Sequence, residues 1–302
     1  MLTRRRCLNG RMTEHLVAVL GRGVLDPDTP VISPDDLGFA RGDGCFDSAR
    51  VVNDASGARV VNLDEHLDRL QNSADRLDII CPPRADWVAL VDQALAAWTT
   101  PGEAVLKFFL TRGREWRPEL GPIGLLTLSE APSKPVVDGK VPAVSRGLRA
   151  ALLSIGRPSD AFVDAPWLLG GVKTLSYVIN VAASREAKER GADDAIFTST
   201  DGFALEGPTS GLIVVTNGVM RTAPTGDTGI LASVTVDEIM RKAAADGMAT
   251  RVELVPVSDL FTADGVFLVS SGRGPCPITE LDGKPLSVDA DLAERVARCA
   301  GF

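Results

Sequence analysis

Apolar residues recur at helical spacing in one long stretch of the first half of the chain. Between residues 62 and 78 they return every three or four positions, which places them on one face of a helix. These residues are Leu63, Leu67, Leu70, Ala74 and Leu77. Asn62 and Glu65 have the spacing of a capping box at the start of this helix. A second helix is expected over residues 84–98.

Short apolar runs on either side of these helices predict strands. Residues 53–57 have the composition of a turn, so the two runs that flank them predict a hairpin. The expected strands lie within residues 15–25, 46–52, 58–61, 105–111 and 123–129. Strands combined with two helices predict an α+β fold.

A proline-rich stretch divides the sequence. Residues 131–142 hold three prolines and show little periodicity, so we expect them to form an interdomain linker. The predicted domains are an N-terminal α+β domain over residues 12–130 and a larger C-terminal domain over residues 143–302.

Strands also dominate the second half. Asp201-Gly202 and Asn217-Gly218 are strong hairpin turn signals, and the runs around them predict a meander. The expected strands cover residues 148–155, 195–200, 203–206, 211–216, 219–222, 252–256 and 266–270. The expected helices run from Lys173 to Arg190, over residues 235–246 and over residues 288–299.

The composition of the chain argues against two kinds of partner, nucleic acids and membranes. The 302 residues carry a net charge of −8 and no basic block, which argues against nucleic acid as a partner. No apolar run approaches the ~20 residues of a membrane span. The basic start of the chain is not followed by an apolar stretch, so a signal peptide is not expected and we predict a cytoplasmic protein.

Cysteine and histidine usage argues against a metal site. The five cysteines are scattered and form no CxxC pair, which is typical of reduced thiols in a cytosol. Only two histidines are present, His15 and His66, so a three-histidine site cannot form. We therefore expect no metal.

One lysine and one glutamate have the surroundings of a cofactor site. Lys173 follows a Gly-Gly pair, and Glu206 lies 33 positions later, before a loop of small and hydroxyl residues over 207–211. A partly desolvated lysine amine is a nucleophile towards aldehydes, and a carboxylate can keep a pyridine nitrogen protonated. Pyridoxal phosphate enzymes need both groups. The alternative is a solvated lysine and an ordinary carboxylate at a strand end.

Two further features fit a phosphate group. Residues 229–235 lead into a predicted helix, and helix N-termini bind phosphate through their free N–H groups. An ordinary N-cap explains this segment equally well. Arg69 lies on the helix over 62–78, where it fits either a surface pair with Glu65 or a guanidinium that binds phosphate.

Taken together, these segments resemble one known family. Residues 42–50, Gly-Asp-Gly-Cys-Phe-Asp-Ser-Ala-Arg, are similar to the GDG-x-F-[ET]-[ST]-x-R signature of the class IV (fold type IV) pyridoxal-phosphate enzymes. Residues 65–70 resemble the helix whose arginine, here Arg69, binds the cofactor phosphate. Lys173 matches the lysine that forms the Schiff base, and Glu206 matches the partner of the pyridine nitrogen.

The resemblance spans about residues 15–280 and implies a fold and a cofactor. It implies a two-domain α+β fold, with a smaller N-terminal domain and a C-terminal cofactor-binding domain that contains a barrel-like β meander. It also implies pyridoxal 5'-phosphate as cofactor, a homodimer, and a phosphate loop in this chain formed by Leu231, Val234 and Thr235.

The resemblance allows more than one activity. The stretch over 44–51 looks closest to 4-amino-4-deoxychorismate lyases, which release pyruvate and 4-aminobenzoate. It implies that Arg112 and Arg41 hold carboxylates of an amino substrate, and that Phe46 and Ser48 lie on the substrate side. The sequence after Lys173 looks more like that of the D-amino-acid and branched-chain aminotransferases, the alternative activity. A binding protein without activity on the same scaffold is the remaining alternative.

Overall fold

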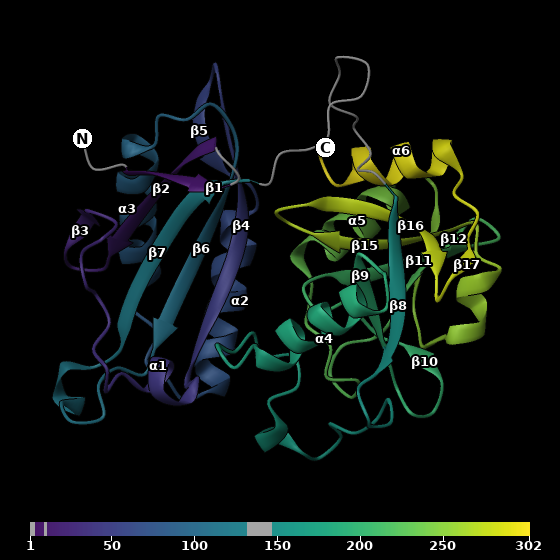
Figure 1. Ribbon diagram of the computed structural model, residues 1–302, viewed down its shortest axis with the longest axis horizontal. Helices are drawn as coiled ribbons and strands as arrows, with labels where there is room; N and C mark the ends of the chain where they lie inside the picture. The colour runs from purple at the N-terminus through teal and green to yellow at the C-terminus, as the bar shows by residue number, and fades with distance from the viewer. Residues whose placement is uncertain (1–3, 9–10, 132–146) are drawn as a thin grey trace. The chain divides into compact units, whose positions relative to one another are not determined.

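The computed structural model describes residues 4–8, 11–131 and 147–302. The described residues fall into two compact units (Figure 1). The first takes those up to residue 131 together with Val172–Tyr177, and the second takes 147–171 together with Val178–Phe302. The domain bounds of the sequence analysis stay a prediction, and the predicted linker lies outside the described residues except for Ala131.

The described part of the first unit contains a seven-stranded sheet in which every pair of neighbours is antiparallel. The strand order is β1-β2-β7-β6-β4-β5, with β3 beside β2 (Figure 1). The strands are β1 (Arg4–Leu8), β2 (Arg11–Val19), β3 (Gly23–Leu25), β4 (Gly44–Asp54), β5 (Gly57–Val60), β6 (Gly102–Thr111) and β7 (Ile123–Glu130).

Side-chain alternation gives this sheet one helix-covered face. Along β6, Ala104, Leu106, Phe108 and Leu110 are at most 1% exposed, whereas Lys107 points the other way and is exposed. The four buried residues form one core with apolar residues of α2 and α3. The helices of this unit are α1 (Leu37–Arg41), α2 (Leu63–Arg76), α3 (Arg84–Ala97) and the 3-10 helix Pro118–Leu120.

The predicted helix over 62–78 is confirmed as α2, but its predicted capping box is wrong. Asn62 adopts a left-handed conformation with φ of 54°, and its side chain makes no capping hydrogen bond. An N-cap residue needs an extended backbone to reach the first free N–H groups. The spacing of Asn62 and Glu65 alone carried no information about that backbone angle.

The described part of the second unit contains a ten-stranded sheet in the order β13-β12-β11-β15-β16-β8-β9-β10-β14, with β17 beside β16 (Figure 1). Its strands are β8 (Leu148–Ser154), β9 (Asp194–Thr198), β10 (Phe203–Ala204), β11 (Gly211–Thr216), β12 (Val219–Thr222), β13 (Ala249–Val252), β14 (Val255–Pro256), β15 (Gly265–Ser270), β16 (Gly274–Leu281) and β17 (Lys284–Pro285). The Asn217-Gly218 turn joins β11 to β12 with φ of 50° and 72°, as predicted.

Both faces of this sheet are buried. Along β11, Ile213 and Val215 pack with α5 and α6, whereas Leu212 and Val214 join a second core. That second core also takes Val255 from the far end of the strand order, so the sheet curls around it. The helices are α4 (Val178–Glu189), α5 (Val234–Ala245), α6 (Ala290–Cys299) and the 3-10 helices Pro166–Leu168 and Val257–Phe261. No helix of the described residues has the length and apolar content needed to span a bilayer.

Candidate active site

The segment that carries Lys173 extends the edge of β4. Strand β5 pairs only with the far end of β4, from Val51 on, so the start of β4 has an open edge. Thr174 forms an antiparallel bridge with Cys45 at that edge, the N–H of Phe46 donates to the Lys173 carbonyl at 3.0 Å, and the N–H of residue 175 donates to the carbonyl of residue 44 at 2.8 Å. The expectation that a helix begins at Lys173 is wrong. Helix α4 begins at Val178, because the backbone after Lys173 is bonded to β4.

Aromatic rings lie beside the Lys173 side chain. Its Nζ atom is 4.5 Å from the centroid of the Phe46 ring and 5.4 Å from that of the Tyr177 ring. These two rings meet edge to face at 5.1 Å, and the Phe46 ring also stacks on Phe109. The Lys173 N–H donates to Ser73 Oγ of α2 at 3.3 Å. The backbone of Lys173, the predicted nucleophile, is therefore hydrogen-bonded on both sides, and its side chain lies beside two aromatic rings.

A buried ionic network holds Arg69, the predicted phosphate ligand. Asp47 of β4 is fully buried and accepts two hydrogen bonds from Arg69, at 2.7 Å from Nε and 2.8 Å from Nη2. His66 Nδ1 lies 2.7 Å from the same carboxylate. Burial alone would raise the pKa of Asp47, but the hydrogen bonds and charge of Arg69, followed by His66, lower that pKa to about 2. Asp47 is therefore ionised, and His66 donates through Nδ1.

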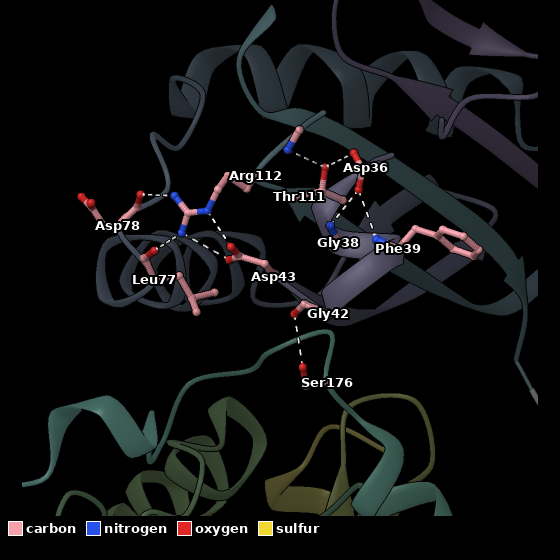
Figure 2. A network of polar contacts seen from close by, with 11 residues as sticks. Asp36, Gly38, Phe39, Gly42, Asp43, Leu77, Asp78, Thr111, Arg112 and Ser176 are labelled. Carbon is pink, nitrogen blue, oxygen red and sulfur yellow. Dashed lines mark hydrogen bonds and ion pairs between the residues drawn. The ribbon is translucent and has the colours of Figure 1, made fainter. Parts of the chain in front are cut away.

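The two arginines predicted to bind substrate carboxylates both contact acidic groups of the chain. Arg112 donates through Nε to Asp43 at 2.6 Å and through Nη2 to the same carboxylate at 3.2 Å, and it also bonds the carbonyls of Leu77 and Asp78 (Figure 2). The hydrogen bond to Asp43 raises the pKa of Arg112. Arg41, 68% exposed, lies 3.4 Å from Glu115. Ser48 lies on β4 two residues after Phe46, on the same face of the sheet.

In the second unit, Glu206 is bonded to the loop that precedes α5. Its Oε2 atom accepts a hydrogen bond from the N–H of Leu231 at 3.2 Å. The loop after Glu206 lies flush against α5, since a Cβ atom at Gly211 would approach Val236 Cγ2 to 2.6 Å. Asn180 of α4 donates to the carbonyl of Pro208 at 2.7 Å. The carboxylate and the helix N-terminus are thus held against each other within one unit.

The start of α5 brings the predicted phosphate loop together. Ser233 caps the helix by accepting from the N–H of Val236, and Val234 and Thr235 are buried in its first turn. Thr235 Oγ1 lies 2.8 Å from Ser271 Oγ, which joins this turn to the end of β15. Hydroxyls and backbone N–H groups at a helix N-terminus suit a phosphate group.

Comparison with known families shows to which family of proteins this chain belongs. Residues 44–281 match the model of the family described as amino-transferase class IV. The chain belongs to this family. The membership confirms the predicted family, the α+β fold type IV architecture, and the prediction of a pyridoxal-phosphate-dependent enzyme. It sets aside the alternative of a binding protein without activity.

Individual relatives extend the match over nearly the whole chain. A bifunctional aminodeoxychorismate lyase / D-amino acid transaminase of Mycobacterium tuberculosis is 34% identical, over 90% of this chain and 93% of that protein. A fold IV transaminase from Curtobacterium pusillum superposes with a TM-score of 0.84 at 35% identity, over 95% of this chain and 99% of that one. The PLP-bound form of a hypothetical aminotransferase from M. tuberculosis gives a TM-score of 0.85 at 32% identity, over 95% and 97%.

The residues of each unit fit the cofactor of the family. The first unit contains the amine of Lys173 beside an aromatic ring. The second contains the carboxylate of Glu206, which is hydrogen-bonded to the loop before α5. The sequence analysis missed Ser73, Asp47 and Tyr177 as neighbours of these groups. Tyr177 had a signal, because it is the single tyrosine of the chain and follows Lys173 by four positions. Ser73 had none, because only the packing of α2 on β4 brings it in. Asp47 lies in the signature stretch over residues 42–50, but its pairing with Arg69 depends on the same packing.

The thiol next to this site should be unreactive. Cys45 is fully buried, and burial, followed by the nearby Cys81 and Asp47, raises the pKa of its thiol to about 12. At pH 8 only about one thiol in 10⁴ would be a thiolate. We expect iodoacetamide to leave Cys45 unmodified in the folded enzyme and to alkylate it in urea, as measured by peptide mass spectrometry. Equal alkylation in both states would contradict the burial of this residue.

Proposed function

We propose that this class IV enzyme is an aminodeoxychorismate lyase that releases 4-aminobenzoate and pyruvate, and that it transaminates D-amino acids at the same lysine. The proposal rests on one observation above all: the Lys173 amine lies beside the rings of Phe46 and Tyr177, in a segment that is bonded to the edge of β4. The name of the M. tuberculosis relative, which joins both activities, supports the combination.

Each residue of the candidate site then has a task. Pyridoxal phosphate, when bound, supplies an aldehyde for the lysine and an electron-withdrawing ring beside the carbon that carries the substrate's amino group. Lys173 is the nucleophile, and once displaced it takes and returns a proton as general base. Glu206 holds a proton on the pyridine nitrogen. Arg69 and the N–H groups and hydroxyls of the loop Leu231–Thr235 bind the phosphate.

The two activities differ in the proton that Lys173 takes and in the product that leaves. For transamination, Lys173 would take the proton from the substrate carbon that carries the amino group. The amino group would stay with the cofactor, when bound, and water would supply the oxygen of the released 2-oxo acid. For the lyase reaction, Lys173 would remove a ring proton, and the bond between the ring carbon and the enolpyruvyl oxygen would break as the ring becomes aromatic. The proton would then pass to the released enolpyruvate, which becomes pyruvate. In both reactions the rings of Phe46 and Tyr177 lie beside the Lys173 amine.

One observation favours the aminotransferase activity as the second candidate. Arg112, which the family resemblance assigns to a carboxylate of the lyase substrate, is bonded to Asp43 in this structure. A lyase substrate with two carboxylates has more need of a dedicated guanidinium than a small D-amino acid has.

The homodimer and the cytoplasmic location stay predictions. Helix α4 exposes Val178 (69%), Ile179 (66%) and Val181 (47%), an apolar group that a second copy would cover.

A single assay with two arms tests the activity. The loaded enzyme is mixed with aminodeoxychorismate and no 2-oxo acid, and separately with D-alanine with and without 2-oxoglutarate. We expect pyruvate and 4-aminobenzoate in equal amounts in the first arm. In the second arm we expect more than one equivalent of pyruvate per enzyme site only when 2-oxoglutarate is present. L-Alanine is the matched substrate of opposite handedness, and L-leucine tests for a branched-chain aminotransferase.

The outcomes separate the candidates. Release of 4-aminobenzoate without D-alanine turnover would leave the lyase alone. D-Alanine turnover without 4-aminobenzoate would leave the aminotransferase alone. Turnover of L-leucine with neither of the others would replace both by a branched-chain aminotransferase.

A further inference from the structure

The Lys173 segment rests on a tight turn formed by Gly42, Asp43 and Gly44. Ser176 Oγ donates to the Gly42 carbonyl at 3.3 Å (Figure 2), and the N–H of residue 175 donates to the Gly44 carbonyl. Both glycines leave the room that this contact needs. A Cβ atom at Gly42, which has φ of 71°, would approach Ser176 Oγ to 2.2 Å, and one at Gly44 would approach a Leu175 methyl to 2.7 Å. Movement of this turn would therefore move the lysine segment.

Arg112 clamps this turn from the other side. Its guanidinium binds the Asp43 carboxylate through Nε and Nη2, and its own N–H donates to the Asp43 carbonyl at 3.2 Å. The same guanidinium donates to the carbonyls of Leu77 at 2.6 Å and Asp78 at 2.9 Å, at the end of α2. The last carbonyls of a helix lack partners within it and attract a cation. Figure 2 shows Arg112 between the end of α2 and the turn.

These contacts occupy most of the donors of Arg112. A guanidinium has five N–H groups, and four of them are used by Asp43, Leu77 and Asp78. A carboxylate ligand bound in the bidentate manner needs two. The geometry of Arg112 therefore suits a fixed clamp and leaves too few donors for the substrate role that the family resemblance assigned to it.

A second set of bonds fixes the preceding segment to the same strand end. Asp36 caps α1 by accepting from the N–H groups of Gly38 and Phe39, and its other oxygen accepts from Thr111 Oγ1 at 2.8 Å (Figure 2). Thr111 directly precedes Arg112. Two neighbouring residues at the end of β6 therefore hold both α1 and the turn that follows it.

We propose that Arg112 and Asp43 form a positioning pair, which holds the turn over residues 42–44 so that the Lys173 segment keeps its place along β4. This inference rests on the proposed role of Lys173. Arg112 then acts on the reaction through Asp43 and the backbone, without touching the substrate. A displacement of about 1 Å at a reacting group can cost about 10²-fold in rate.

The test uses the full-length chain and a step in which no substrate takes part. Apoenzyme is mixed with pyridoxal phosphate, and the rate of linkage at Lys173 is followed by absorbance and confirmed by borohydride labelling. Arg112→Met and Asp43→Asn should each slow this linkage roughly 10-fold or more, and the double variant should be no slower than the worse single one. Arg112→Lys keeps the charge without the fork and should recover only part of the rate.

Steady-state kinetics with D-alanine give the second readout. A positioning pair predicts that both variants lower kcat by about 10- to 100-fold and change KM by less than about 3-fold. Arg149→Met is the matched control, because Arg149 makes a similar two-pronged pair with Asp193 in the second unit. It should leave linkage and kcat unchanged, and thermal melting checks that each variant is folded.

The outcomes separate this inference from the proposed function. Suppose that Arg112→Met raises KM for D-alanine without changing the linkage rate, and that Asp43→Asn changes neither quantity. Arg112 then binds substrate, and the positioning role is wrong. If the unmodified enzyme forms no linkage at Lys173, the proposed function is wrong, and this inference fails with it.

Discussion

Replacing Lys173 with alanine should reduce turnover by about 10⁴-fold or more, because the same amine serves as nucleophile and as general base. The folded state should be little changed. The backbone of Lys173, through its bonds to Phe46 and Ser73, fixes the segment, and the substitution leaves those bonds in place. The measurement is kcat with D-alanine and with aminodeoxychorismate, together with peptide mapping after borohydride reduction.

Two matched variants make this result specific. Lys173→Arg keeps a cation at the same position but cannot act as the nucleophile, so it should be as inactive as the alanine variant. Lys188→Ala removes an exposed lysine from the last turn of α4 and should keep full activity and labelling. Borohydride labelling of another lysine in the unmodified enzyme would overturn the assignment of Lys173.

The sequence predicted those parts of the site whose signal spans only a few neighbouring residues. There are three such signals: a lysine after two glycines, a glutamate before a run of small residues, and a segment that leads into a helix. The family match then confirmed the class of enzyme and the cofactor. The strands predicted from apolar runs over residues 105–111 and 123–129 are confirmed as β6 and β7.

What the sequence could not predict depends on residues far apart in the chain. A helix was expected to begin at Lys173, but backbone bonds tie Lys173 and Thr174 to the edge of β4. The family resemblance implied that Arg112 holds a substrate carboxylate, yet the carboxylate that it binds in this structure is that of Asp43, 69 positions away. Tertiary contacts of this kind override local preference, because each satisfies backbone or charged groups that would otherwise lose their hydrogen bonds.

Asp47→Asn should lower the free energy of unfolding by roughly 3 kcal/mol, because it leaves the Arg69 charge without its buried partner. The carboxylate is fully buried, and the Arg69 side chain is only 11% exposed, so water cannot compensate. We also expect weaker retention of pyridoxal phosphate, since Asp47 sets the orientation of the guanidinium that we propose as phosphate ligand. Urea unfolding of the apoenzyme measures the first effect, and dialysis of the loaded enzyme measures the second.

The same carboxylate gives the enzyme a defined loss of stability in acid. Its pKa in the folded state is about 2, below the usual 3.8, so the folded state favours the ionised form. This contribution, about 2 kcal/mol, is complete above about pH 5 and is lost progressively as the pH falls through about 2. In Asp47→Asn this part of the acid dependence should be missing.

Asp54→Asn is the matched control for both effects. Asp54 lies on the same strand and also has a pKa lowered to about 2, by Ser56 and Arg59, but its side chain is 45% exposed. Exposed pairs contribute little, because water solvates each charge when the other is removed. Asp54→Asn should therefore leave the urea midpoint unchanged. If the two variants unfold at the same urea concentration, burial of the pair with Arg69 is not what makes Asp47 important.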